Sequence, residues 1–355
     1  MSVTQAENGC WEVSVWYRDW QGNRRRKHKR GFATKRDAKA WETSFIARQA
    51  GSPDMRFADF FELYEQDRRP HLKLNTWKTK ENIVLTKIMP YFGDMKLCDI
   101  APADILKWQS QMLNHRDKRG NRYSNTYLRT VSNQLTSMLN HAVRYYGLPA
   151  NPVSKAGKMG NSKGSEMQFW TKEEYRRFSR EVMAKPLSYL AFEVLYWTGI
   201  REGELLALTP GDFDLAKRTL SITKSYQRIE GQDVVTCPKT PKSNRVIAIS
   251  DFLAEEAAEH FALYPCEPDE RIFKVSKSYL YHEIDRGSNA AGVKRIRVHD
   301  LRHSHVSLLI DLGFNPLAIA DRMGHESVDI TFRYAHLFPN AQGQMASALQ
   351  KEKGY

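Results

Sequence analysis

The sequence predicts an α+β protein of several domains in which helices outnumber strands. With 355 residues, the chain is too long for one ordinary hydrophobic core. Apolar residues alternate with period two only in residues 9–32 and 219–249, whereas residues 55–148 repeat them at helical spacing. We therefore expect a small β-sheet with one helix, then an all-helical domain, then a mostly helical domain with a small three-stranded sheet.

Residues 1–52 are expected to form the small sheet and its helix. The turn of the predicted hairpin falls at residues 19–23, and Thr34 is placed to cap the helix that follows. The first strand carries four apolar side chains on one face, which are Trp11, Val13, Val15 and Tyr17.

The returning strand of this hairpin holds seven basic or histidine residues in succession. Charged side chains are common on solvated edge strands. A β-ribbon can also enter a DNA groove, where cations contact phosphates and a few side chains read bases. The length of the run favours DNA, and the candidate contacts are Arg24, Arg25, Arg26, Lys27, Lys29 and Arg30.

Residues 55–150 are expected to form the all-helical domain. Phenylalanines and a tyrosine form the first helical stripe, Asn75 is placed to cap a second helix, and Pro102 suits the first turn of a third. A fourth helix is expected to begin at Ser124 and to end at Gly147. These stripes are typical of a packed core.

The rest of the chain divides into three parts. Repeated Gly, Ser and Lys predict an exposed basic linker over residues 151–169. Residues 170–340 mix helix and strand and are expected to form the third domain. The tail, residues 341–355, has partly helical spacing, and contact with a neighbouring protomer and a disordered tail are both left open.

Composition limits the kinds of partner and compartment. A net charge of +13 and a pI of about 9.4 indicate a polyanion as partner. No apolar run approaches the roughly 18 residues that cross a membrane. Residues 1–10 contain no basic region followed by an apolar one, so we do not expect a secretory signal there. The four cysteines lack CxxC spacing, which favours free thiols in a cytoplasm over a zinc site.

The third domain contains the residue types that cleave a phosphodiester without a metal ion. Such a reaction requires a nucleophile, cations that hold the non-bridging oxygens, and an acid that protonates the leaving oxygen. Matching side chains occur in order within five runs, T-G-I-R-E-G-E-L (198–205), C-P-K-T-P-K-S-N-R (237–245), V-H-D-L-R-H (298–303), M-G-H (323–325) and F-R-Y-A-H (332–336). Each run alone is weak, but chance agreement of all five is improbable.

In these runs the chain resembles the tyrosine recombinases, specifically the integrases of phages and conjugative transposons. The resemblance extends over essentially the whole chain. It implies an arm-type DNA-binding domain in residues 1–52, a core-site DNA-binding domain in residues 55–150 and a catalytic domain in residues 170–340. It also implies double-stranded DNA with core and arm sites as substrate, a homotetramer on DNA, and no metal or other cofactor. An excisionase and a DNA-bending protein are candidate accessory partners.

The resemblance also implies the role of each site residue. Tyr334 would be the nucleophile and would form a 3′-phosphotyrosyl bond. Lys239 would protonate the departing 5′ oxygen, with Lys242 as a rival, and His299 would assist proton transfer at the tyrosine. The phosphate would be held by the remaining site residues, Arg201, Arg302 and His325, with Glu204 as their support.

Three other functions are compatible with parts of this sequence. The run H-D-L-R-H superficially resembles the HExxH motif of a metalloprotease, but it has Asp where the base should be and an arginine beside the metal position. A non-catalytic DNA-binding protein would need only the basic hairpin and the helices. A type IB topoisomerase shares the chemistry, but the two N-terminal domains favour site-specific recombination.

Overall fold

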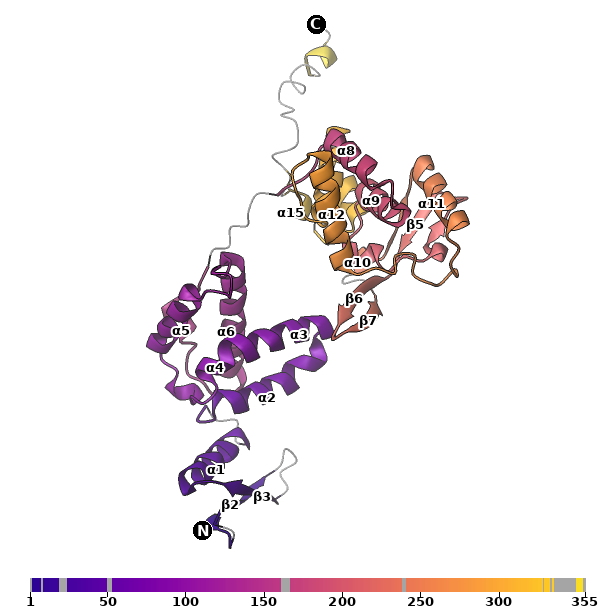
Figure 1. Cartoon of the computed structure of the whole chain (residues 1–355). Helices are drawn as coiled ribbons and strands as arrows, with labels where there is room; N and C mark the ends of the chain where they lie inside the picture. Colours follow the sequence, from indigo (N-terminus) through magenta and orange to yellow (C-terminus); the bar gives the residue numbers. More distant parts are fainter. Residues whose placement is uncertain are drawn as a thin grey trace. The chain divides into compact units, whose positions relative to one another are not determined.

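The computed structural model describes residues 2–7, 9–18, 24–49, 53–160, 167–237, 241–327, 329–332, 334 and 349–353. The chain divides into two compact units, Met1–Ser165 and Glu166–Tyr355 (Figure 1). Among the described residues, no helix is long and apolar enough to cross a membrane.

The first unit begins with a three-stranded antiparallel sheet of order β1-β2-β3, formed by β1 (Val3–Gln5), β2 (Trp11–Arg18) and β3 (Arg24–Phe32). Helix α1 (Lys35–Gln49) begins as predicted, because the backbone N–H of Asp37 donates to Oγ1 of Thr34 at 3.1 Å. The helix packs on the sheet face that carries Val13 and Val15, and their shared core excludes water from this face. The predicted pairing of the two hairpin strands and the helix are therefore confirmed, and β1 is an additional strand. The predicted turn at residues 19–23 lies outside the described residues.

The helical part of the first unit surrounds an aromatic core that includes Phe57, Phe60, Trp77 and Trp108. Ser124 caps the longest helix, because its Oγ accepts from the N–H of Tyr127 at 3.2 Å. The second predicted helix begins one residue before Asn75 and continues into a π-helical turn, η2 (Val84–Ile88). The other elements are α2 (Phe57–Arg68), η1 (Arg69–His71), α3 (Leu74–Ile83), α4 (Met89–Phe92), η3 (Leu97–Asp99), α5 (Pro102–Asn114), α6 (Asn125–Tyr145) and α7 (Val153–Ala156).

Residues 151–160 were expected to belong to an exposed linker, and this expectation is wrong. Val153 and Met159 are buried against α5 and α6. Gln109 on α5 donates to the carbonyl of Gly157 at 2.8 Å, and Asn151 donates to Asn140 on α6 at 2.7 Å. The apolar side chains fill space between the two helices, although the average composition of the segment is polar. Of the predicted linker, residues 161–166 lie outside the described residues.

The second unit contains a three-stranded sheet, as predicted, but not all of its strands come from residues 219–249, where the apolar residues alternate. Its antiparallel order is β4-β5-β8, formed by β4 (Phe213–Asp214), β5 (Thr219–Ile222) and β8 (Arg245–Ala248). The intervening strands β6 (Ser225–Ile229) and β7 (Gln232–Thr236) form a separate hairpin. Strand β8 returns beside β5, with Leu220 opposite Ile247, and this pairing places residues 241–245 beside the helices that carry the site.

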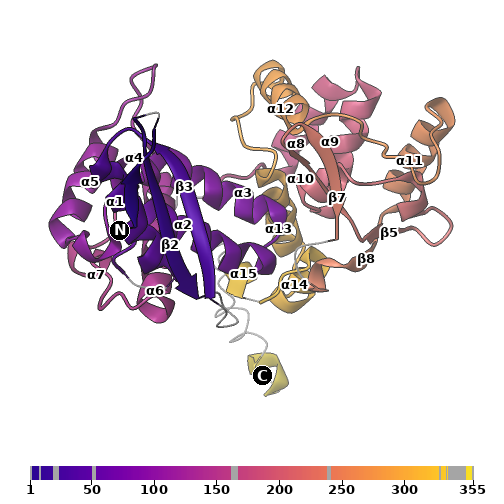
Figure 2. The same cartoon turned by 90° about the horizontal axis from the view of Figure 1, so that it is seen from below.

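Helix α9 (Pro186–Thr198) lies at the centre of the second unit and packs against α8 (Lys172–Val182), α11 (Asp251–Leu263) and α13 (Asp300–Asp311) (Figure 2). It is apolar on nearly all sides, as a helix buried all round should be. Gly199 ends it with a φ of +67°, and a Cβ there would lie 2.6 Å from Cδ2 of His305. Only glycine fits this corner, which begins the segment that holds Arg201.

The other helices that the structure describes in this unit are α10 (Glu202–Leu205), η4 (Pro210–Asp212), η5 (Pro241–Ser243), α12 (Lys277–Ala291), α14 (Pro316–Met323) and α15 (Asp329–Phe332). Helix α14 has a residue typical of a helix cap at each end. Oδ1 of Asn315 accepts from the N–H of Ala318 at 2.8 Å, and Gly324 ends the helix with a φ of +62°. These caps fix where the chain turns toward Tyr334.

Candidate active site

The structure brings together five of the six predicted catalytic residues. Arg201 lies at the start of α10, and His299 and Arg302 lie at the start of α13. His325 follows the glycine that ends α14, and Tyr334 follows α15. The sixth residue, Lys239, lies outside the described residues. Its rival Lys242 is described, and its Nζ donates to the backbone carbonyl of Glu326 at 3.2 Å.

Arg201 is held by the acidic residue at the start of its own helix. Its backbone N–H donates to Oε2 of Glu204 at 2.9 Å, and its Nη1 donates to Oε1 of the same carboxylate at 2.7 Å. The guanidinium also donates to Oγ of Ser243 at 3.2 Å and to the carbonyl of Gly324 at 3.4 Å. These contacts fix the guanidinium while leaving part of the side chain open to solvent.

Arg302 joins the ends of two helices. Its Nη1 donates to the carbonyl of Gly199 at 2.7 Å, and its Nη2 donates to the carbonyl of Met323 at 2.6 Å. Both carbonyls lie at helix C-termini, where the partial charge is negative and attracts a cation. Burial and the neighbouring Arg201 nevertheless lower the pKa of Arg302 to about 9. The cluster therefore has an excess of positive charge, which an anion would relieve.

Glu204 has a second cation as partner, Arg245 on β8. Nη2 of Arg245 donates to Oε2 of Glu204 at 3.1 Å, and Nε of Arg245 donates to the carbonyl of Arg322 at 3.0 Å. Burial raises the pKa of Glu204, but Arg245 and Arg201 outweigh it and hold that pKa below its ordinary value. The carboxylate stays ionised and orients both guanidiniums. Arg245 ends the run C-P-K-T-P-K-S-N-R, but the resemblance predicted no role for it.

His325 is buried and uncharged. Its Nδ1 lies 2.9 Å from Oγ1 of Thr331, on α15. Burial, Arg302 and Arg201 lower the pKa of His325 to about 3, so the ring is neutral at working pH. When the threonine hydroxyl donates, Nε2 carries the proton and can donate a hydrogen bond to a phosphate oxygen.

Tyr334 is buried among Val306, Ile310 and other apolar residues, and its hydroxyl forms a hydrogen bond with Nδ1 of His303. His303 lies in the run V-H-D-L-R-H, but the resemblance predicted no role for it. It lies one turn after His299, whose ring packs against it edge-on with the centroids 5.3 Å apart. Its position in the run H-D-L-R-H, directly after Arg302, was the signal that could have identified it.

The predicted arm contacts lie along the exposed strand β3, but pairing with β2 divides them between two faces. Arg24, Arg26 and Arg30 share the open face, where the guanidiniums of Arg24 and Arg26 lie 4.6 and 5.8 Å from the centre of the exposed Trp16 ring. The other three, Arg25, Lys27 and Lys29, lie on the α1 side, where Nζ of Lys29 is 5.1 Å from the Trp41 ring centre.

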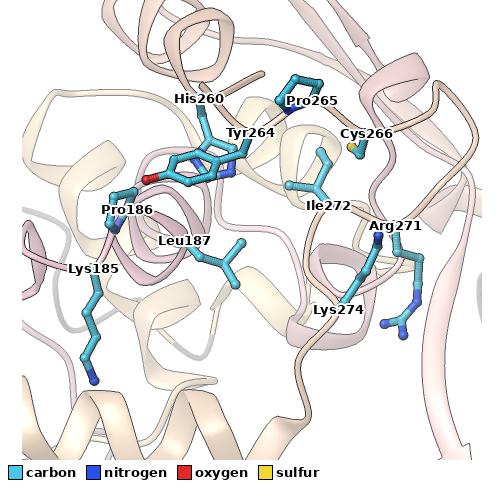
Figure 3. Close-up of a pocket in the computed structure, with 10 residues that line it drawn as sticks. All are labelled: Lys185, Pro186, Leu187, His260, Tyr264, Pro265, Cys266, Arg271, Ile272 and Lys274. Carbon is cyan, nitrogen blue, oxygen red and sulfur yellow. The ribbon is translucent and has the colours of Figure 1, made fainter. Parts of the chain in front are cut away.

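A cavity of 420 Å³ lies elsewhere in the second unit, and Figure 3 shows the residues that line it. Its cations are already paired with carboxylates. Lys185 lies 2.5 Å from Glu283, Arg271 lies 3.0 Å from Asp233, and Lys274 lies 2.5 Å from Glu270. Unlike the arginine cluster, this cavity has no excess charge for a phosphate. A smaller cavity of 360 Å³ borders the cluster itself at Arg245, Gly324 and His325.

Comparison with known proteins agrees with this arrangement. Residues 168–341 match the model of the phage integrase family, residues 56–113 match a phage integrase N-terminal SAM-like domain, and residues 1–49 match an arm DNA-binding domain. The chain is 28% identical to the ICEBs1 integrase of Bacillus subtilis, over 98% of this chain and 99% of that protein. It is 25% identical to the integrase of Staphylococcus phage L54a, over 68% of this chain and 82% of that protein.

Solved structures share the fold at lower sequence identity. The Tn1549 transposon integrase in complex with transposon right end DNA matches with a TM-score of 0.67 and 17% identity, over 85% of this chain and 100% of that chain. A lambda integrase tetramer bound to a Holliday junction matches with a TM-score of 0.58 and 17% identity, over 92% of this chain and 96% of that chain. With its family domains and its integrase relatives, this chain belongs to the phage integrase family and is a site-specific recombinase of the tyrosine type.

Proposed function

We propose that the chain integrates and excises a mobile element by cutting and rejoining DNA through a covalent 3′-phosphotyrosyl bond to Tyr334. The observation that carries this assignment is the gathering of Arg201, Arg302 and His325 at the C-terminal end of α14, close to the Tyr334 hydroxyl, with Glu204 ionised beside Arg201. A scissile phosphate would supply the negative charge that the cluster lacks.

Each cluster residue has a physical reason for its role. Guanidiniums bind phosphate oxygens through two parallel N–H donors, and fixed donors need no rearrangement as charge develops in the transition state. Arg302 is fixed by two main-chain carbonyls and Arg201 by Glu204. We assign both arginines and Nε2 of His325 to the non-bridging oxygens, and Glu204 to the support of Arg201.

The bond changes balance without a cofactor. The Tyr334 oxygen gives its proton to a neighbouring histidine and bonds to phosphorus, while the bond from phosphorus to the 5′ oxygen breaks and Lys239 gives that oxygen its proton. The ester retains the energy of the broken linkage, so the 5′-hydroxyl of a partner strand can reverse the step without ATP. We prefer Lys239 to Lys242, because Lys242 is already engaged with the carbonyl of Glu326.

The whole protein would act in the bacterial cytoplasm as a homotetramer on DNA. Residues 55–150 and 170–340 would bind the core site, and residues 1–52 would bind separate arm sites. The exposed cations of β3 support the arm assignment. An excisionase and a DNA-bending protein would set the direction of the reaction. Deleting residues 1–50 should abolish integration and spare core-site cleavage, and an equal loss of both would contradict the arm assignment.

The experiment is single-turnover cleavage of a nicked core site, which releases a short 5′-hydroxyl strand and traps the adduct. The wild-type protein should form a denaturation-resistant adduct, and Tyr334→Phe should form none while still binding DNA. Tyr264→Phe is the matched control, because Tyr264 lines the separate 420 Å³ cavity. An adduct with Tyr334→Phe would refute the assignment. Relaxation of supercoiled DNA without any core site would favour a type IB topoisomerase.

A further inference from the structure

We propose that His303 is a catalytic residue that takes the proton of the Tyr334 hydroxyl as the tyrosine attacks DNA. The inference rests on the proposed function, because it concerns the same nucleophile. Nδ1 of His303 and the hydroxyl of Tyr334 form a hydrogen bond, and the ring centroids are 5.6 Å apart. A general base must lie within hydrogen-bond reach of the proton that it removes, and His303 meets this condition.

The surroundings of His303 orient its ring for this task. Its Nε2 lies 3.8 Å from Oδ1 of Asp300, one turn earlier on α13. Asp300 is buried and fixed by Arg297, whose Nη2 donates to Oδ1 at 2.7 Å and whose backbone N–H donates to Oδ2 at 2.9 Å. This separation is too long for a hydrogen bond, but the carboxylate still favours the tautomer with its proton on Nε2. That tautomer leaves the Nδ1 lone pair for the tyrosine.

The charges around His303 make it a base that becomes effective when DNA is bound. The groups that face it are Asp300, Arg297, Arg302, His299 and Tyr334. Burial, the His299 ring and the two arginines lower the pKa of His303 to about 4, although Asp300 opposes them. The ring is therefore neutral and able to accept a proton. A bound phosphate would offset the arginine charges, which would raise the proton affinity of His303 at the moment of attack.

The step conserves atoms and charge. The Tyr334 oxygen forms its bond to phosphorus while the bond from phosphorus to the 5′ oxygen breaks, the phenolic proton passes to Nδ1 of His303, and Lys239 protonates the leaving 5′ oxygen. The imidazolium then lies between the Asp300 carboxylate and the phosphate. During rejoining, the 5′-hydroxyl oxygen of a partner strand bonds to phosphorus and gives its proton to Lys239, while the bond between phosphorus and the Tyr334 oxygen breaks and His303 returns the proton to the phenol.

His299 has a different position, although the family resemblance gives it the proton-transfer role. Its side chain is exposed, and its ring packs against the ring of His303. His299 therefore acts on the tyrosine through His303, and its open side is accessible to a DNA phosphate. The geometry assigns the direct contact with the nucleophile to His303.

The test compares two variants of the full-length protein in single-turnover cleavage of the nicked core site. His303→Asn keeps an acceptor near the position of Nδ1 but cannot take a proton, whereas His303→Leu has neither property. Both should slow cleavage by about 10²- to 10⁴-fold and leave core-site binding unchanged. His282→Asn, at an exposed histidine of α12, is the matched control and should cleave like the wild type.

A second measurement separates proton transfer from packing. Replacing Tyr334 by 3,5-difluorotyrosine makes the phenol more acidic, so it should restore most of the rate lost in both His303 variants. Near wild-type cleavage by His303→Asn, or a defect that the fluorinated tyrosine does not relieve, would overturn the inference. Those results would leave the proposed function intact, whereas cleavage by Tyr334→Phe would refute the proposed function itself.

Discussion

Replacing Glu204 by glutamine removes the one charge that the structure places between two site arginines. The substitution keeps the size of the side chain and one acceptor oxygen. It leaves Arg245, whose side chain is 8% exposed, without its carboxylate. Arg201 loses the same partner at 2.7 Å, but it is 37% exposed and can turn toward water. The cost should therefore come mainly from Arg245.

Breaking a buried ion pair by removing one partner costs about 3 to 5 kcal/mol, because the other charge stays buried. For a unit of this size, that loss corresponds to a fall in melting temperature of roughly 6 to 20 °C. Glu283→Gln is the matched control. Glu283 is equally buried, but its partners Lys185 and Arg286 are 46% and 40% exposed, so about 1 kcal/mol or less is expected.

The assay is urea unfolding of the full chain, followed by tryptophan fluorescence, with and without core-site DNA. Without DNA, the Glu204→Gln protein should unfold at a much lower urea concentration than the wild type. With DNA, the difference in stability should become smaller but should not disappear, because a bound phosphate cannot replace the carboxylate at Arg245. A loss below about 1 kcal/mol without DNA, or equal losses for both variants, would refute the view that Glu204 holds the cluster together.

Three further predictions follow from charge and pH. The free energy of unfolding should fall as pH drops below about 6.5, by up to about 1.4 kcal/mol per pH unit for each histidine whose pKa is lowered, because the unfolded chain takes up protons that the folded histidines bind only at lower pH. Melting curves from pH 7.5 to 5 measure the total over the histidines with lowered pKa values, which are His260, His299, His303, His305 and His325. A flat profile would contradict this prediction. On the open face of β3, Arg24→Ala and Arg26→Ala should each lower the affinity for arm-site DNA more than Lys29→Ala does on the other face. A mobility-shift assay measures these affinities, and the reverse order would place the DNA on the face of Lys29. Core-site affinity should fall steeply from 50 to 200 mM salt as counterions are released, and a slope near zero in a salt titration would argue against phosphate contacts.

Much of the fold was predictable because local signals and the tertiary structure agree. Helix caps are an example, because a cap depends only on backbone groups that are near in the sequence. Ser124 and Asn315 cap the first turns of their helices, and Gly324 ends α14. The exposed linker was wrong over residues 151–160, because two buried apolar side chains outweigh a polar average. The pairing of β8 with β5 could not be predicted from the alternation of apolar and polar residues. Alternation indicates that a segment is a strand but not which strand lies beside it.

The site was predictable as a set of residues but not as a network of contacts. The motifs named Arg201, Arg302, His325 and Tyr334, and the resemblance implied Glu204 as a support, but neither indicated which groups hold Arg302 and Tyr334. Main-chain carbonyls anchor Arg302, and a sequence pattern contains no sign of them. The contact with His303 depends on how the segment after α15 meets α13, which only the folded chain determines.

The measurement that tests the central claim most directly is the site of covalent attachment. Wild-type protein trapped on a nicked core site would be digested with protease and nuclease, and the peptide that carries a nucleotide would be sequenced by tandem mass spectrometry. We predict a 3′-linked nucleotide on the oxygen of Tyr334 and on none of the other tyrosines. Attachment to any other residue, or cleavage without attachment, would contradict the proposed chemistry.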